Sequence, residues 1–203
     1  MSGRSVLFYG DSFTAGVGDP TALGWVGRVA AACQPLTPYV LGVRGETSAQ
    51  VAARWQGEAW PRLRVATAAG VVFAVGANDA LGEAADDGPP RIDAGASVAI
   101  VGDLLDGAAL MRLPAFVVGP APVGAPAADA RVRALDDAYG RLCHARGVPY
   151  AAVAPALLDD ARWREEASAG DGAHPGAAGY ARLAELVLAA GFRDWLETRV
   201  GRG

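Results

Sequence analysis

Three residues far apart in the chain could together activate a nucleophile: Ser12, Asp171 and His174. Ser12 follows the apolar segment Val6–Tyr9 after two residues, so its hydroxyl lies where a buried strand would end. A serine hydroxyl is a weak nucleophile until a neighbouring base takes its proton. In the motif D-x-x-H, Asp171 could hold one ring nitrogen of His174 and leave the other free to act as that base. Each motif alone is also typical of an ordinary turn or helix start.

The two histidines occur in different settings. His144 lies inside a helical pattern, and we expect it to be solvent-exposed without a special role. His174 precedes Pro175, and proline is favoured at the first position of a helix. This order predicts that His174 is the N-cap of the last long helix and keeps its side chain in loop geometry.

Attack on an acyl carbonyl also requires donors for the negative charge that develops on its oxygen. Asn78, in the motif G-A-N-D, would bring a side-chain amide to the end of a strand. Gly45 would offer a backbone N–H that no side chain obstructs, and the N–H of Ser12 would complete the set. Asn78 and Gly45 are also common turn residues, so their types alone leave the role open.

The elements that must position these residues alternate between short apolar and longer amphipathic segments, which indicates strand–helix units around a parallel sheet. We expect strands buried on both faces at Val6–Tyr9, Tyr39–Gly42, Gly70–Val75, Ala115–Gly119 and Val148–Ala151. The expected helices are Trp25–Cys33, Ser48–Trp55, Ile92–Arg112, Ala128–Arg146, Pro175–Ala190 and Phe192–Val200, with loops at Leu81–Arg91 and Pro120–Pro126. Parallel sheets bind ligands outside the carboxyl ends of their strands, so the polar segments after the strands should share one rim.

Composition narrows the class of protein. The 203 residues are 52% apolar and 20% charged, without a break in composition, which predicts one domain over residues 1–203. The net charge of -4 gives no reason to expect binding to nucleic acid or an anionic membrane. No segment is typical of a membrane span or a secretory signal, and Cys33 and Cys143 suit two buried thiols, so we expect a cytoplasmic protein.

Taken together, the motifs resemble the SGNH hydrolases, also called GDSL-type lipases and esterases. The resemblance is carried by Gly10-Asp11-Ser12, Gly45, Gly76-Ala77-Asn78-Asp79 and Asp171-x-x-His174, in the order of the family's four blocks. It implies an α/β fold, a three-layer α/β/α sandwich around a five-stranded parallel sheet of the flavodoxin-like kind, with no metal or organic cofactor. It also implies that Ser12 is the nucleophile, His174 the general base and Asp171 the residue that orients the histidine.

By the same resemblance, the N–H groups of Ser12 and Gly45 and the amide of Asn78 would form the oxyanion hole. Asp11 is expected to hold the turn by accepting backbone N–H groups, and Asp79 to support Asn78 from behind. Thr47 and its neighbour Glu46 are expected to cap the following helix. The expected function is a serine-dependent ester hydrolase for short-chain acyl or acetyl esters, with a small-molecule substrate and an oligomeric state that the sequence does not indicate.

The sequence also bears on other classes of protein. The G-x-S-x-G motif of the larger α/β-hydrolase family is absent, as are the G-x-G-x-x-G motif and the P-loop lysine of nucleotide-binding proteins. An acyltransferase or a carbohydrate O-acetylesterase would use the same residues, and a non-catalytic binding module on this scaffold is a further alternative. The absence of a lid-like insertion favours an open, shallow site over a long-chain lipase tunnel.

Overall fold

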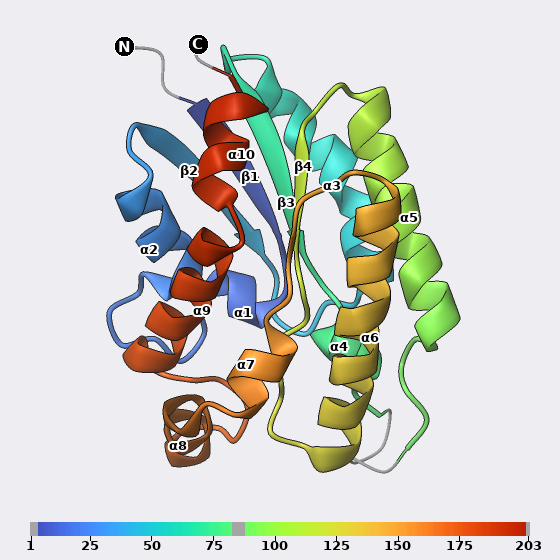
Figure 1. Cartoon of the computed structure of the whole chain (residues 1–203), viewed down its shortest axis with the longest axis vertical. Coiled ribbons are helices and arrows are strands. Elements are labelled where there is room, and N and C mark those ends of the chain that lie inside the picture. Colours follow the sequence, from blue (N-terminus) through green and yellow to red (C-terminus); the bar gives the residue numbers. More distant parts are fainter. Residues whose placement is uncertain (1–3, 83–87, 202–203) are drawn as a thin grey trace.

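The computed structural model describes residues 4–82 and 88–201, and its centre is one parallel sheet (Figure 1). The strands are β1 (Arg4–Gly10), β2 (Leu36–Gly42), β3 (Ala69–Ala74), β4 (Ala115–Val118) and β5 (Tyr150–Ala151). They are ordered β2-β1-β3-β4-β5, and every neighbouring pair is parallel. This is the flavodoxin-like order, in which the chain direction across the sheet reverses between β1 and β3.

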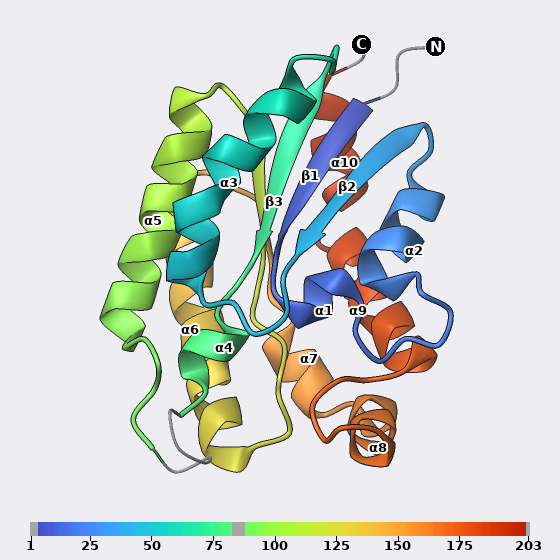
Figure 2. The same ribbon diagram turned by 180° about the vertical axis from the view of Figure 1, so that it is seen from behind.

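Helices cover both faces of the sheet and make a three-layer α/β/α fold (Figures 1 and 2). One face carries α2 (Gly24–Ala32), α9 (Ala177–Ala189) and α10 (Phe192–Thr198). The other carries α3 (Ser48–Leu63), α5 (Ala94–Leu110) and α6 (Pro126–Ala145). Near the carboxyl ends of the strands lie α1 (Ser12–Ala15), α4 (Ala77–Ala80), α7 (Ala154–Leu158) and α8 (Ala161–Ala169). The fold predicted from the sequence is confirmed.

Alternation along β1 creates two separate hydrophobic cores. Phe8 points to one face, where its ring lies 5.6 Å from the ring of Trp25. Tyr9 points to the opposite face and stacks on Phe73 at 6.2 Å. Complete burial of one such aromatic side chain is worth about 1.5–3 kcal/mol, so β1 anchors both layers and gives the polar residues after it a rigid base.

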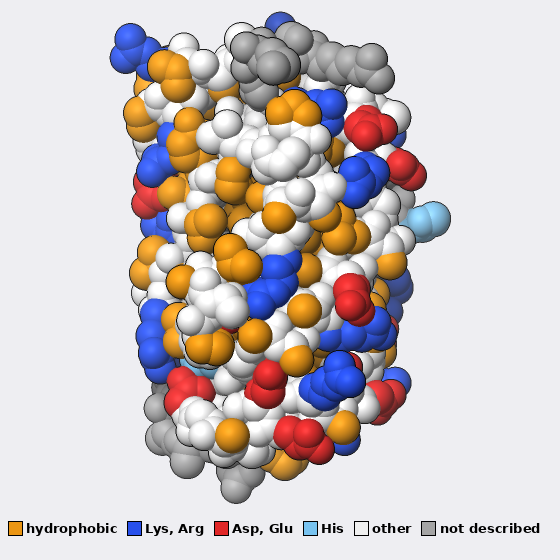
Figure 3. Space-filling view, turned by 90° about the vertical axis from the view of Figure 1, so that its left-hand side faces the viewer, with side chains coloured by type: hydrophobic (Ala, Val, Ile, Leu, Met, Phe, Trp, Pro, Cys, Tyr) orange, Lys and Arg blue, Asp and Glu red, His pale blue; other side chains and the backbone are white. Residues whose placement is uncertain are grey.

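The edge strand β2 corrects the expectation that all strands are buried on both faces. Most of its side chains are only partly buried, and Val40 is 48% exposed. The reason is topological, since β2 lies at the edge of the sheet, next to β1. On this side of the molecule, hydrophobic side chains are interspersed with charged ones (Figure 3).

Several element boundaries also differ from the prediction. Helix α3 continues two turns beyond Trp55, to Leu63, and includes Pro61 near its end. Helices α1, α4, α7 and α8 were not predicted. Two of them have only four residues, too few to show a helical period, and α8 buries only two residues, so it has no apolar stripe. The predicted loop Leu81–Arg91 lies partly outside the described residues, because 83–87 are not described, and the predicted loop Pro120–Pro126 ends where α6 begins.

The two thiols are both free and buried, as expected for Cys33 and Cys143. Burial raises the pKa of the Cys143 thiol to about 12, so it stays protonated near neutral pH. Within residues 4–82 and 88–201, none of the helices has the length and apolar character needed to cross a membrane.

Candidate active site

The turn after β1 presents Ser12 at the point where the sheet reverses direction. Gly10 is required there, because a Cβ atom would lie 2.2 Å from Thr14 Oγ1 and 2.3 Å from the Ala74 carbonyl oxygen. Asp11 then caps α1, and its Oδ1 accepts the Phe13 N–H at 2.9 Å. Ser12 is the first residue of this single-turn helix, so its hydroxyl stands at the carboxyl edge of the sheet.

Ser12 and the D-x-x-H motif meet in the fold although 162 residues separate Ser12 from His174. His174 Nε2 lies 2.8 Å from Ser12 Oγ, and His174 Nδ1 lies 2.7 Å from Asp171 Oδ2. With a proton on Nδ1, the imidazole donates to the carboxylate and accepts from the serine hydroxyl. The imidazole also packs 5.0 Å from the Phe13 ring, which fixes its plane. This geometry allows a proton to pass from the hydroxyl to the ring.

Asp171 remains ionised in this arrangement. Its Oδ1 accepts the backbone N–H groups of His174 at 3.0 Å and Ala173 at 3.1 Å. The backbone hydrogen bond from His174 is the largest influence on the pKa of Asp171; it outweighs burial, which acts in the opposite direction, and together with the other hydrogen bonds holds this pKa well below its usual value. The side chain is 41% exposed, so solvent screens part of the effect.

The predicted N-cap role of His174 is wrong. Helix α9 begins at Ala177, and its N-cap is Gly176, which provides no side-chain hydrogen bond. The first turn is satisfied instead by Glu166 from α8, whose two carboxylate oxygens accept the N–H groups of Ala178 at 3.1 Å and Gly179 at 2.7 Å. Because an acidic side chain from another helix supplies the cap, the His174 side chain is not needed for capping and lies in the loop, where it contacts Ser12 and Asp171.

Asn78 lies beside Ser12 because β3 is the neighbour of β1. Its Nδ2 donates to Asp11 Oδ2 at 3.1 Å, a contact that the sequence did not predict. An amide nitrogen carries two hydrogens, so a second donor remains for the cleft. The bond to Asp11 thereby fixes the direction of the Asn78 amide.

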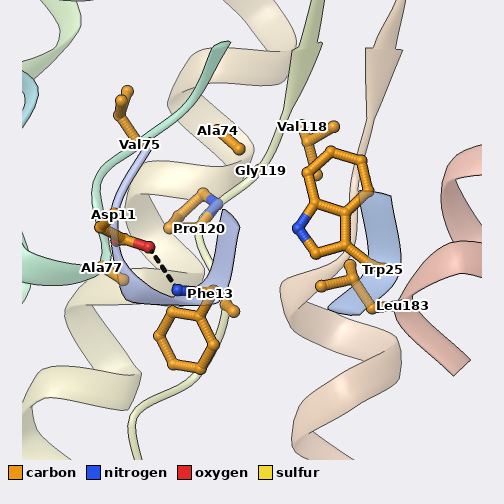
Figure 4. Close-up of a pocket in the computed structure, with 11 residues that line it drawn as sticks. Asp11, Phe13, Trp25, Ala74, Val75, Ala77, Val118, Gly119, Pro120 and Leu183 are labelled. Carbon is orange, nitrogen blue, oxygen red and sulfur yellow. Dashed lines mark hydrogen bonds between the residues drawn. The ribbon is translucent and has the colours of Figure 1, made fainter. Parts of the chain in front are cut away.

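Asp11 itself has an unusual environment. It is 3% exposed and borders a small buried pocket whose other lining includes Trp25, Val118 and Leu183 (Figure 4). Burial raises the pKa of Asp11 to about 7, although the hydrogen bonds from Phe13 and Asn78 act in the opposite direction. Trp25 belongs to this core, with 1% of its side chain exposed, and does not reach the cleft.

Asp79 is completely buried behind Asn78. Its Oδ1 accepts the Ser48 N–H, at the start of α3, at 2.8 Å, and its Oδ2 accepts the Ser97 hydroxyl at 2.5 Å. Ser97 also pairs with the Tyr139 hydroxyl. This network joins the turn after β3 to three helices.

Gly45 lies on the loop after β2, at the edge of the site. Its φ of 81° and the Glu46 N–H bond to the Val43 carbonyl at 3.2 Å place it in a tight turn that favours glycine. Nothing lies within 4 Å of the position that a Cβ would take, and Gly45 is not among the residues that line the cleft. Beyond it, Thr47 forms a capping box with Gln50, as expected, whereas Glu46 pairs with Arg54.

Two arginines at this edge were not predicted as part of the site. Arg44 Nη2 lies 3.2 Å from Asp171 Oδ2, and Arg91 Nη1 donates to the Gly45 carbonyl at 2.9 Å. Both arginines are exposed, and each makes its contact through the guanidinium group at the end of its long side chain. No local sequence pattern marks such contacts, because the partners are 127 and 46 residues away.

A cleft of about 410 Å³ opens over these groups. Ser12, Asn78 and His174 line this cleft together with Phe13, Leu81 and Val123. The remaining lining residues are Gly124, Ala125, Asp171, Gly172 and Ala173. The cleft thus combines a hydroxyl, an imidazole and an amide with apolar and small lining residues.

Comparison with known proteins identifies the family of the chain. The GDSL-like lipase/acylhydrolase family matches residues 8–182, so the chain belongs to that family and is an ester-hydrolysing enzyme. No curated protein sequence matches the chain significantly.

Solved structures share the fold at low sequence identity. A catalytic mutant of an acetylxylan esterase from Geobacillus stearothermophilus has 18% identity and a TM-score of 0.74, over 100% of this chain and 98% of that chain. A lipase/acylhydrolase from Enterococcus faecalis has 21% identity and a TM-score of 0.71, over 92% and 94% of the two chains. A structure of TesA has 21% identity and a TM-score of 0.70, over 92% and 97%.

Proposed function

We propose that the chain is a serine-dependent carboxylic ester hydrolase in which Ser12 is the nucleophile, His174 the general base and Asp171 the orienting carboxylate. The observation that carries this proposal is the continuous chain of hydrogen bonds from Ser12 Oγ through the imidazole to Asp171, with distances of 2.8 and 2.7 Å, among the residues that line an open cleft. A serine next to a neutral imidazole is activated, and the ionised carboxylate stabilises the imidazolium that forms.

The reaction proceeds in two halves. Ser12 Oγ bonds to the ester carbonyl carbon while its proton moves to His174 Nε2. The oxyanion accepts from the N–H groups of Ser12 and Gly45 and from the Asn78 amide. When the carbon–oxygen bond breaks, the leaving alcohol takes the proton from Nε2, and water then attacks the acyl-enzyme by the same route in reverse roles. In this scheme Asp11 and Asp79 touch no reacting atom and hold the Asn78 turn.

We propose short acyl or acetyl esters of small molecules as substrates. Part of the cleft lining consists of small residues, namely Gly124, Ala125, Gly172 and Ala173, and one similar fold is that of an acetylxylan esterase, which supports a carbohydrate O-acetylesterase as one form of this activity. An acyltransferase would use the same acyl-enzyme with an alcohol in place of water. We further propose that residues 1–203 act as one hydrolase domain. Cytoplasmic localisation stays a prediction from the sequence.

The proposal is tested by hydrolysis of p-nitrophenyl esters from acetate to decanoate with the wild-type enzyme and with Ser12→Ala and His174→Ala. We expect both variants to lose nearly all turnover, because nucleophile and base act as a unit. Wild-type turnover should fall steeply beyond about four acyl carbons, since the cleft is open and a longer acyl chain would stay largely exposed to solvent. Full activity of Ser12→Ala would refute the nucleophile, and equal rates on all chain lengths would refute only the short-chain specificity.

A further inference from the structure

The loop that carries Gly45 is held from outside by the side chain of Arg91. The guanidinium Nη1 donates to the Gly45 carbonyl oxygen at 2.9 Å. Because a charged donor strengthens a hydrogen bond, this contact fixes the peptide group that follows Gly45. The other side of the same turn is closed by the Glu46 N–H bond to the Val43 carbonyl.

The backbone of Arg91 is in turn fixed to the segment that follows Asn78. The Arg91 N–H donates to the Leu81 carbonyl at 2.8 Å, and the next residue, Ile92, donates to the Asp79 carbonyl at 3.2 Å. One residue therefore connects two segments that come from different strands: the turn after β3 and the loop after β2.

The buried network of Asp79 connects the same two segments from the inside, because Asp79 Oδ1 holds the Ser48 N–H just beyond the Gly45 loop. Arg91 supplies the corresponding connection on the solvent side. Oxyanion donors work only within about 2.7–3.1 Å of the developing charge, so the distance between two donor-bearing segments must be held closely.

We propose that Arg91 is a positioning residue for the oxyanion hole, which it serves by tying the Gly45 loop to the Asn78 turn. This inference rests on the proposed function, in which Gly45 and Asn78 supply donors. Arg91 itself touches no reacting atom. Its effect is to hold the Gly45 loop, and with it the Gly45 N–H, at a fixed distance from the Asn78 turn.

The test compares Arg91→Ala, Arg91→Lys and Asn78→Ala on p-nitrophenyl acetate, with kcat and KM measured separately. We expect Arg91→Ala to lower kcat about tenfold with little change in KM, less than the roughly 10²-fold loss for a removed donor. The inhibition constant of an alkyl trifluoromethyl ketone, which forms an oxyanion on the serine, should rise by the same factor. Arg91→Lys should keep part of the activity, and added guanidinium ion should restore part of it to Arg91→Ala but none to Asn78→Ala.

Arg131 provides the matched control. Its side chain also donates to backbone carbonyls of the segment that follows β3, to Ala80 at 3.0 Å and to Gly88 at 2.8 Å. Among the described contacts, no bond joins Arg131 to Gly45. Arg131→Ala should leave kcat and ketone affinity near the wild-type values. Equal losses in both variants would overturn the inference, since they would reflect a loosened loop rather than a misplaced Gly45.

Together with Ser12→Ala, these variants distinguish a failure of the role proposed for Arg91 from a failure of the proposed function. Wild-type kcat in Arg91→Ala together with a large loss in Asn78→Ala would overturn the role of Arg91 and leave the proposed function standing. Undiminished activity in both Asn78→Ala and Ser12→Ala would overturn the proposed function and the role of Arg91 with it.

Discussion

Two aspartates lie near Ser12, and their environments are opposite. Asp11 lies on the sheet side, 3% exposed, above apolar side chains, and burial raises its pKa to about 7. Asp171 lies on the loop side, with its side chain 41% exposed, and hydrogen bonds led by the His174 N–H hold its pKa well below the usual range. Near neutral pH the carboxyl group of Asp171 is therefore ionised, whereas that of Asp11 is partly protonated.

This difference separates their roles. A carboxylate that stays ionised and contacts His174 can stabilise an imidazolium, and that is the position of Asp171. Asp11 contacts Asn78 and the Phe13 N–H instead, so it shapes the turn that presents Ser12. In the proposed mechanism the chemistry depends on the exposed aspartate, and the stability of the turn depends on the buried one.

Of the variants considered, a substitution of Asp171 should have the largest effect on kcat. Asp171→Asn should lower kcat about 10³-fold or more, because the amide no longer stabilises the charged imidazole or selects its tautomer. The melting temperature should change little, since the side chain is well exposed. Steady-state kinetics and thermal unfolding of the same sample check both parts. Retention of a tenth or more of the wild-type kcat would argue against the orienting role.

The next effect concerns the amide that Asp11 holds. Asn78→Ala should reduce kcat about 10²-fold with a small change in KM, because its donor acts on the transition state. Kinetics on p-nitrophenyl acetate measure this split. A raised KM with normal kcat would place Asn78 in ground-state binding instead.

A third prediction concerns stability and pH. The pKa of Asp11 is about 7 in the fold and about 3.8 in the unfolded chain, so the unfolded chain loses this proton first. Its contribution to stability is complete below pH 4 and disappears as the pH rises towards 7. Asp11→Asn removes this loss, so its free energy of unfolding relative to wild type should increase between pH 4 and 7, by on the order of 1–4 kcal/mol.

Asp171→Asn is the control for that titration. The pKa of Asp171 is lowered in the fold, so its contribution is present above pH 4 and is lost only as the pH falls through the folded pKa. The difference in free energy of unfolding between Asp171→Asn and wild type, measured by urea unfolding, should stay constant between pH 4 and 7. If both variants gave the same pH profile, the contrast between the two environments would be wrong.

The smallest effect is expected for Arg44→Ala. Arg44 reaches Asp171 Oδ2 at 3.2 Å, but its side chain is 66% exposed, and exposed ion pairs contribute little. We expect kcat to change by less than about threefold, and the effect to shrink further at high salt. A tenfold loss would show that Arg44 takes a direct part in orienting the carboxylate.

Much of the fold could be predicted because its signals are local. Apolar segments that end in glycine or a polar turn marked all five strands, and their parallel arrangement followed from the helices between them. The order of strands and the exposure of β2 are long-range properties that no single segment carries. The missed start of α9 has the same origin, since its cap, Glu166, comes from another helix.

In the site, too, features with a local sequence signal could be predicted and long-range contacts could not. The residue types and their places after strands predicted that Ser12, Asn78 and His174 would share a rim, and the structure brings them to one cleft. The sequence did not indicate the Asp11–Asn78 bond or the two arginines, because such contacts depend on side-chain direction and reach. Residues that support the site were therefore harder to predict than those that line it.

The most direct test of the central claim is covalent labelling with a serine-reactive alkyl phosphonate, followed by peptide mass analysis. Ser12 is one of several serines, but among the described residues it is the one whose hydroxyl lines the cleft 2.8 Å from a histidine nitrogen. We expect one phosphonate on the peptide containing Ser12, loss of esterase activity in step with labelling, and no label in His174→Ala. A label on another residue, or full activity with Ser12 modified, would contradict the account.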